Sequence, residues 1–248
     1  MNEYLNVLAI DTATKYQSIA LLKGKRLLDH RVERVRYNHG SSLLANIDHL
    51  ISAQAMEVDD LDLLTVGLGP GSFTGLRVGL ATAKALGRAT NIPIVGISSL
   101  AAMAYGASHY YPGAAIAATI DARRKEVYGG VYSFQDQNFT TLIDDSALSP
   151  QHWIAAVEAL SNDTIIMVGE GNDAYRSIAQ WDDQRLIRVP LYIHSPWATS
   201  LAILGRNKAS LHGGDDLNSL EPNYIRPSDA KLPDKQFRSL SDLIDLSS

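Results

Sequence analysis

The 248-residue sequence contains no cysteine. The chain therefore cannot form a disulfide framework, and it cannot use a thiolate as a nucleophile or metal ligand. The N-terminal residues also lack the basic segment and the long apolar core of a secretory signal. We therefore expect a protein of a reducing compartment, with the cytoplasm as its location.

Residues 89–120 contain no Asp, Glu, Lys or Arg. Such a stretch could be mistaken for a membrane span, but it is interrupted by Pro93, Gly96, Gly106, Pro112 and Gly113. The pieces between these residues are too short to cross a bilayer as one helix. We interpret them as buried strands and a buried helix, and we expect no contact with a membrane.

The chain also lacks a strong excess of either charge. Residues 1–110 carry ten Lys or Arg and nine Asp or Glu, and the remainder carries twelve and eighteen, which gives the net charge of −5. A small basic cluster is formed by Lys23, Lys25, Arg26, Arg31, Arg34 and Arg36, with Asp29 and Glu33 among them. A solvated hairpin face is the interpretation we favour, and contact with nucleic acid is the alternative.

Motifs for metal, phosphate or nucleophile chemistry are missing as well. The seven histidines form no H-E-x-x-H pattern, and the glycine-rich stretch at Gly69–Gly75 matches neither a P-loop nor a dinucleotide fingerprint. A turn role for this stretch is favoured over contact with an anion at the start of the following helix. We predict no catalytic residue, no cofactor and no metal.

The apolar pattern alternates between strands and helices, which is typical of an α/β fold. Strands are expected at 5–10, 18–22, 27–35, 63–68, 94–97, 139–143 and 165–168, and helices from about 41, 75, 99, 150, 174 and 197.

The pattern of strand, Asp, turn and strand occurs twice, at an offset of 110 residues. Ile10-Asp11 corresponds to Ile120-Asp121, and Lys15 corresponds to Lys125. This repeat predicts two lobes of related topology, at 1–110 and 111–213, followed by a tail at 214–248 that returns over the surface.

Asp11 and Asp121 each follow a buried strand and are the best candidates for ionisable site residues. A carboxylate in this place could hold Mg²⁺ beside a nucleotide phosphate in a cleft between lobes. Side chains rather than glycines follow both residues, as Thr12-Ala13-Thr14 and Ala122-Arg123-Arg124. A structural role as turn caps is therefore favoured, and the two residues mark at most a vestigial cleft.

Gly75, Gly79, Ala83 and Gly87 recur at intervals of four residues. A helix would carry them as one stripe that allows close approach of another backbone. Whether that backbone belongs to the same lobe or to another chain stays open on the pattern alone.

The segments that carry a family resemblance are GPGSFTGLRVGLATAKAL at 69–86, AIDTAT at 9–14, IDARRKEVY at 120–128, VGEG at 168–171 and PNYIR at 222–226. Together they resemble the bacterial TsaB (YeaZ) family over residues 5–227. The resemblance implies an α/β, two-lobed actin-like fold of the ASKHA or ribonuclease H-like class with duplicated lobes.

The family implies a non-catalytic paralogue of TsaD, the transferase that places a threonylcarbamoyl group on adenosine 37 of tRNAs reading codons that begin with A. The implied partners are TsaD in a heterodimer, the ATPase TsaE in a larger complex, and tRNA through that complex. Without the partner, the same surface could also join two copies of the chain as a homodimer. An independent actin-like kinase or a metallopeptidase is the alternative.

The resemblance also implies which residues act. The metal-binding histidines of TsaD align with Ser99 and Met103, neither of which suits a hard catalytic cation. The implied partner surface is a pair of helices near 41–53 and 75–89. Its expected contact residues are Leu43, Leu44, Ile47, Gly75, Arg77, Gly79, Ala83 and Gly87.

Overall fold

Two five-stranded sheets follow one another along the chain in this computed structural model, which describes residues 5–35, 40–136, 138–190 and 197–226. The first sheet has the order β3-β2-β1-β4-β5 and the second the order β10-β9-β6-β7-β8. In each sheet three antiparallel strands are followed by two parallel ones. The predicted duplication of topology is therefore confirmed.

The strands of the first sheet are β1 (Asn6–Asp11), β2 (Tyr16–Lys23), β3 (Arg26–Arg34), β4 (Leu63–Gly67) and β5 (Ile94–Ile97). Those of the second are β6 (Ala115–Arg123), β7 (Glu126–Gln135), β8 (Asn138–Leu148), β9 (Ile165–Val168) and β10 (Leu186–Arg188). The helices are α1 (Gly40–Ser52), the 3₁₀ turn η1 (Val58–Asp60), α2 (Phe73–Thr90), α3 (Ser99–Ser108), α4 (Pro150–Glu158), α5 (Gly171–Ala174), α6 (Arg176–Ala179) and α7 (Trp197–His212).

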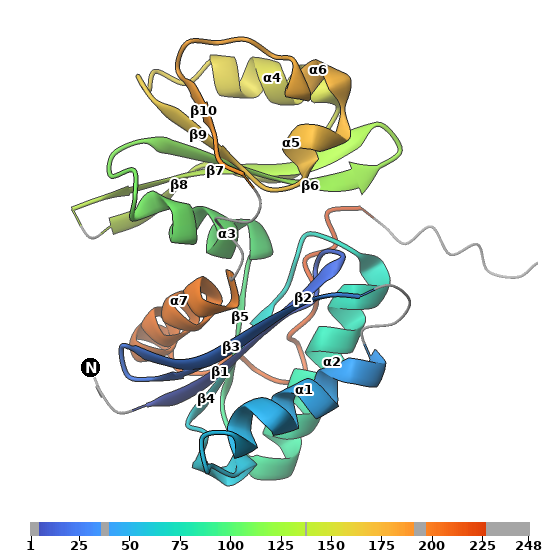
Figure 1. Cartoon of the computed structure of the whole chain (residues 1–248), viewed down its shortest axis with the longest axis vertical. Coiled ribbons are helices and arrows are strands. Elements are labelled where there is room, and N and C mark those ends of the chain that lie inside the picture. Colours follow the sequence, from blue (N-terminus) through green and yellow to red (C-terminus); the bar gives the residue numbers. More distant parts are fainter. Residues whose placement is uncertain (1–4, 36–39, 137, 191–196, 227–248) are drawn as a thin grey trace, which may run out of the picture.

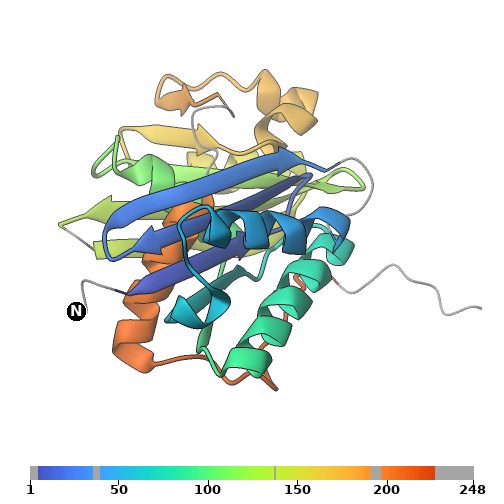
Figure 2. The same cartoon turned by 60° about the horizontal axis from the view of Figure 1, so that its bottom comes forward.

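The helices form three layers around the two sheets (Figure 1). Helices α1 and α2 cover the outer face of the first sheet, and α4 to α6 cover the outer face of the second (Figures 1 and 2). Helices α3 and α7 lie between the sheets and pack against each other. The central layer is therefore buried by both lobes at once.

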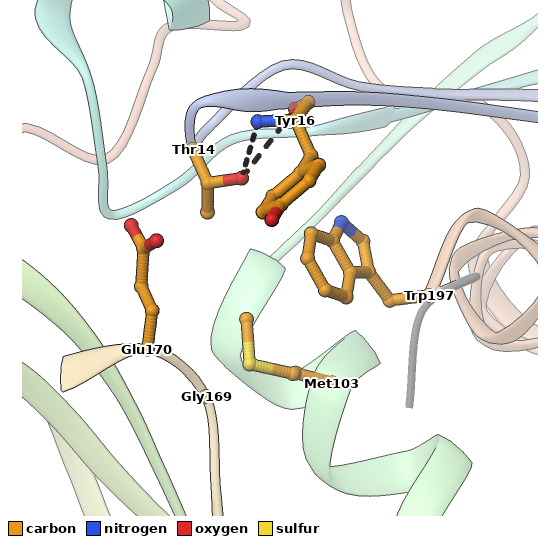
Figure 3. Close-up of a pocket in the computed structure, with 6 residues that line it drawn as sticks. All are labelled: Thr14, Tyr16, Met103, Gly169, Glu170 and Trp197. Carbon is orange, nitrogen blue, oxygen red and sulfur yellow. Dashed lines mark hydrogen bonds between the residues drawn. The ribbon is translucent and has the colours of Figure 1, made fainter. Parts of the chain in front are cut away.

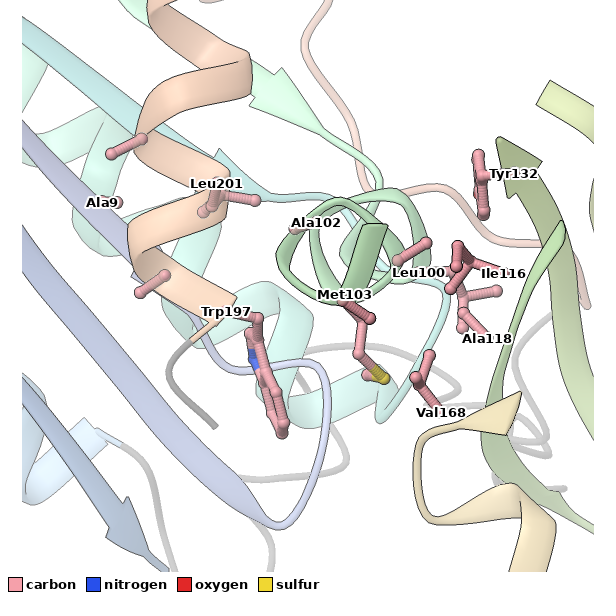
Figure 4. Close-up of a cluster of buried hydrophobic side chains, with 14 of the residues drawn as sticks. Ala9, Leu100, Ala102, Met103, Ile116, Ala118, Tyr132, Val168, Trp197 and Leu201 are labelled. Atoms are coloured by element: carbon pink, nitrogen blue, oxygen red, sulfur yellow. The ribbon is translucent and has the colours of Figure 1, made fainter. Parts of the chain in front are cut away.

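The central core joins side chains from both lobes (Figure 4). Ala9 of β1 and Leu201 of α7 lie on one side of α3, and Ile116 and Ala118 of β6 lie on the other. Met103 of α3 is buried between them. Nearly every residue of α3 is buried, because both of its sides face a lobe.

Serine side chains fix the starts of three helices. Ser72, Ser98 and Ser149 precede α2, α3 and α4, and each accepts a hydrogen bond from a backbone N–H in the first turn. Such caps satisfy donors that have no partner within the helix. Because Ser72 is the cap, α2 begins two residues before the expected start at Gly75.

Two helices pack on the sheet of the lobe opposite to the one that their position in the sequence predicts. Helix α3 lies within 1–110 but packs on β6 and β7, and α7 lies within 111–213 but packs on β1, β2, β4 and β5. The expected ranges therefore follow the sheets and not the helices. Residues 214–226 return along the first lobe, where Asp215 N–H donates to Ile94 O at 2.8 Å, and the rest of the expected tail lies outside the described residues.

Three details of the second lobe differ from expectation. The helix expected at 174–181 is two short helices, α5 and α6, and β10 is a further strand beside β9. The expected start signal of α7, Ser195-Pro196, lies outside the described residues. Within the described part of the chain, each helix is too short or too polar to span a bilayer.

Candidate functional site: the cleft and the outer helix face

The Asp11 carboxylate at the end of β1 is completely buried. Its Oδ1 accepts the N–H of Ala13 at 2.9 Å, and its Oδ2 accepts the Ser99 hydroxyl of α3 at 2.6 Å. Ser99 Oγ in turn accepts the N–H of Gly69 at 3.2 Å. The carboxylate thus ties the first strand to the loop before α2 and to the interlobe helix. Both of its oxygens have partners within the chain.

Asp121 occupies the corresponding place in the second lobe, but it is exposed. Its Oδ1 accepts the N–H of Arg123 at 2.8 Å and the Tyr175 hydroxyl at 3.1 Å. Burial of the phenol, and then the neighbouring Asp121 carboxylate, raise the pKa of Tyr175. Asp121 therefore caps the turn at Arg123, as its expected structural role implied.

The loop that follows β1 fills the space in front of α2. A Cβ on Gly71 would lie 2.2 Å from Ala13 O, and one on Gly75 would lie 2.1 Å from Thr12 O. The N–H of Ser72 donates to Ala13 O at 2.7 Å, and Thr12 Oγ1 donates to Gly75 O at 2.7 Å. Donors at a helix N-terminus can bind an anion. Here the chain's own backbone lies against that end of the helix.

The glycine stripe therefore packs within the first lobe. A Cβ on Gly79 would lie 2.3 Å from Thr12 Oγ1, one on Gly87 would lie 2.7 Å from Ile94 Cδ1, and Ala83 is fully buried. The expectation that Gly75, Gly79, Ala83 and Gly87 contact a partner is corrected, because the lobe already covers them.

Two of the expected contacts on α1 are also buried. Leu43 and Ile47 pack toward the first sheet and are 0% and 2% exposed. Leu44, one residue further round the helix, is 57% exposed. Of the three, only Leu44 can therefore contact another molecule without opening the lobe.

Arg77 is exposed, but its side chain is held by aromatic neighbours. Its guanidinium lies 3.8 Å from the ring centre of Phe73, and its Nε donates to the Tyr224 hydroxyl at 3.0 Å. Stacking of this kind stabilises an exposed arginine in one orientation. Arg77 therefore anchors the returning C-terminal segment on α2.

That segment, residues 222–226, crosses from the first lobe to the second, and we call it the strap. At one end, the N–H of Asn223 donates to Leu68 O at 2.7 Å. At the other end, Arg226 pairs with Glu126 at 2.6 Å and donates to Ala122 O at 2.9 Å. PNYIR was noted in the sequence only as part of a resemblance, and its bridging role depends on contacts far apart in the chain.

The lobes also meet through a second ion pair and around a small hollow, whose lining residues are drawn in Figure 3. Lys15 Nζ of the first lobe lies 2.5 Å from Glu170 Oε2 of the second. The hollow is lined by Thr14, Tyr16, Met103, Gly169, Glu170 and Trp197. Its volume is about 10 Å³, which is room for about one water, whereas ligand sites occupy roughly 300–1,000 Å³.

Met103 therefore fills the cleft at a place where the resemblance aligned a metal-binding histidine. The other such place, Ser99, is occupied by the hydroxyl that binds Asp11. Among the described residues, no three His, Asp or Glu side chains gather closely enough to hold a metal ion. That the protein binds no metal or cofactor stays a prediction.

The solvent side of α2 carries a feature that the sequence interpretation missed. Ala81, Ala85 and Ala89 are exposed and recur every four residues. Each lies two residues beyond a member of the buried stripe, which places it about 200° round the helix. We call Leu44 together with these three alanines the outer helix face. The period alone could have identified this stripe, since two small-residue rows are visible in α2.

Comparisons with known proteins give a consistent result. A family model described as "TsaD: tRNA N6-adenosine threonylcarbamoyltransferase" matches residues 33–233. The chain is 26% identical to the tRNA threonylcarbamoyladenosine biosynthesis protein TsaB of Bacillus subtilis, covering 92% of this chain and 96% of that protein. It is 32% identical to the Haemophilus influenzae protein of the same name, covering 71% and 76%.

Solved structures support the fold. A Pseudomonas aeruginosa protein described as similar to the peptidase YeaZ has a TM-score of 0.77 and 28% identity, covering 90% of this chain and all of that one. Component A of the Acidaminococcus fermentans (R)-2-hydroxyglutaryl-CoA dehydratase has a TM-score of 0.52 at 12% identity, covering 83% and 99%. The two-lobed, actin-like α/β fold with duplicated lobes is thereby confirmed.

Proposed function

We propose, because the chain belongs to the TsaB family, that it takes part in threonylcarbamoyladenosine biosynthesis as a non-catalytic subunit that binds a TsaD-type transferase. The modified base is adenosine 37 of tRNAs that read codons beginning with A, and a TsaE-type ATPase joins the complex. The cytoplasm is the expected place of this activity.

The filled cleft is the observation that carries the non-catalytic assignment. The hollow lined by Thr14, Tyr16, Met103, Gly169, Glu170 and Trp197 is about 10 Å³, which is room for about one water and far below the usual size of a ligand pocket. The Asp11 carboxylate is bound to Ala13 and Ser99, and the loop at Thr12 covers the start of α2. These contacts oppose the alternatives of an independent kinase or a metallopeptidase.

The outer helix face is the proposed partner surface. Leu44 supplies an exposed apolar side chain, and the alanines of α2 supply a flat row that a helix of the partner can approach closely. The buried glycine stripe supports this surface from below by holding α2 on the Thr12 loop. Without the partner, two copies can associate through the same face.

Reconstitution tests the proposal directly. The purified chain, a TsaD-type transferase and a TsaE-type ATPase are assayed separately and together for modified tRNA and for ATP turnover. We expect the chain alone to do neither, and we expect modification by the transferase to depend on the chain. Enzymatic ATP hydrolysis, peptide hydrolysis or tRNA modification by the chain alone would refute the assignment.

A further inference from the structure

Arg77 extends the outer helix face toward the start of α2. It is exposed and lies four residues before Ala81, so the two residues are neighbours on the surface of the helix. We propose that the Arg77 guanidinium binds a carboxylate of the transferase, and that Tyr224 of the strap positions it for this contact. This inference rests on the proposed function, since it assumes that the transferase binds the outer helix face.

Two aromatic side chains fix the plane of the Arg77 guanidinium. Its carbon Cζ lies 3.8 Å from the ring centre of Phe73 and 5.9 Å from that of Tyr224. The two ring centres are 5.1 Å apart. The Arg77 Nε also donates to the Tyr224 hydroxyl at 3.0 Å. Because the guanidinium is planar, these contacts set the direction of its remaining N–H groups before a partner arrives.

The remaining N–H groups of Arg77 suit a carboxylate. Its Nη1 and Nη2 atoms have no acceptor within the described part of the chain, where the hydrogen bond of its side chain is the one from Nε. Arg77 also forms no ion pair with a described residue. These two nitrogens form the end of the fork with which arginine binds both oxygens of one carboxylate.

The charge of α2 specifies the sign of the partner group. The helix contains Arg77, Lys84 and Arg88 and no Asp or Glu. Arg88 donates to the neutral Asn218 Oδ1 at 3.1 Å, so this contact does not balance its charge. A partner surface with a carboxylate near Arg77 is therefore attracted to α2, and one with a basic group there is repelled.

Tyr224 connects this contact with the second lobe. The strap that carries Tyr224 is held at its other end by Arg226, which pairs with Glu126 at 2.6 Å. Tyr224 need not touch the transferase to assist binding. By holding Arg77 in one orientation, it reduces the side-chain freedom that complex formation would otherwise remove.

Substitutions of Arg77 test the carboxylate contact. The dissociation constant for the transferase is measured by calorimetry with the full-length chain. Arg77→Gln should raise this constant about 10- to 150-fold, because hydrogen bonds to a charged group are lost. Arg77→Lys keeps the charge without the planar fork, so its loss should be smaller. Added salt should weaken the wild-type complex more than the Arg77→Gln complex.

A double-mutant cycle tests the positioning role of Tyr224. Tyr224→Phe keeps the ring and removes the hydroxyl that accepts from Arg77 Nε, which should raise the dissociation constant about 2- to 12-fold. In the Arg77→Gln background the same substitution should have no further effect, because no guanidinium is left to orient. Equal effects in both backgrounds would show that Tyr224 does not act through Arg77.

Two controls separate the carboxylate contact from other effects. Arg176 of α6 is also exposed, and its Nε also donates to a neutral oxygen, Gln180 Oε1, at 2.9 Å. Arg176→Gln, on the second lobe, should bind the transferase like wild type. Glu126→Gln removes the ion pair at the far end of the strap without touching Arg77, and it should also bind like wild type. Thermal unfolding verifies that each variant folds.

Normal binding by Arg77→Gln would overturn the inference, and so would an equal loss in either control. Arg77→Glu should lose binding, and a Lys or Arg in place of one acidic residue of the transferase should restore it. If no such replacement restores binding, Arg77 does not bind a carboxylate. Failure of the wild-type chain to bind the transferase would refute the proposed function, whereas binding that depends on Leu44 but not on Arg77 would refute this inference alone.

Discussion

Truncation of Leu44 measures how much the outer helix face contributes to binding the transferase. Leu44 is 57% exposed, and full burial of a leucine is worth about 1.5–3 kcal/mol, so covering its exposed part contributes about 0.9–1.7 kcal/mol. Leu44→Ala should therefore weaken the complex by about 4- to 16-fold. Leu44→Asp should weaken it further, because a carboxylate would be buried without a partner. Titration of the transferase by calorimetry gives these dissociation constants.

Two leucines on other surfaces are matched controls for Leu44. Leu142 of β8 is 41% exposed and Leu211 of α7 is 77% exposed. Their alanine variants should bind the transferase like wild type. A Leu44→Asp variant that folds and binds normally would refute the proposed surface, as would an equal loss in either control.

Ala85→Leu, on the alanine row of α2, should also weaken binding, because the leucine side chain would hold the partner's helix away from α2.

The remaining predictions concern stability. Gly75→Ala should lower the free energy of unfolding by about 1–3 kcal/mol although alanine favours helices, because its Cβ would lie 2.1 Å from Thr12 O. The exposed control Ala85→Gly should lower it by about 1 kcal/mol through helix propensity alone. Urea unfolding of both variants measures these changes. Burial raises the pKa of Asp145, which accepts the Ser98 hydroxyl at 2.5 Å. A raised pKa in the folded state favours the protonated form, so its contribution to stability is present at low pH and is lost as pH rises through that pKa. Asp145→Asn should remove this pH dependence, so the difference in the free energy of unfolding between the variant and wild type should change between pH 4 and pH 7. If the two plots of unfolding free energy against pH are parallel, the pKa of Asp145 is not shifted by folding.

Local patterns predicted the strands well and their surroundings less well. The bounds of β5 and β9 follow from short apolar runs that end at Pro, Gly or polar residues, and the structure has them as expected. Strand β10 has only three residues and depends on its neighbour β9, so no periodic signal marked it. The repeat at Asp11 and Asp121 predicted two sheets of one topology. It could not predict that α3 and α7 pack across the lobes, because both helices are apolar on several sides.

The glycine stripe is a second case in which the sequence pattern predicted close packing but not the packing partner. A four-residue period predicts that one face of α2 is closely packed, but the period contains no information about which backbone approaches that face. In the structure, Thr12 of the loop after β1 is the residue that approaches Gly75 and Gly79. The alanine row on the opposite side was equally periodic, and its exposure becomes evident only once the helix is placed on the sheet.

One set of contacts connects the filled cleft with the outer helix face. In a nucleotide-binding site, glycines leave room for a phosphate to approach the backbone. In this chain Gly71, Gly75 and Gly79 give the same room to the loop at Thr12 and Ala13. That loop covers the start of α2 and also fixes the helix on the first sheet, with its alanine row toward solvent. Moving that loop away to admit an anion would therefore remove the contacts that hold α2, the helix on which the partner is proposed to bind.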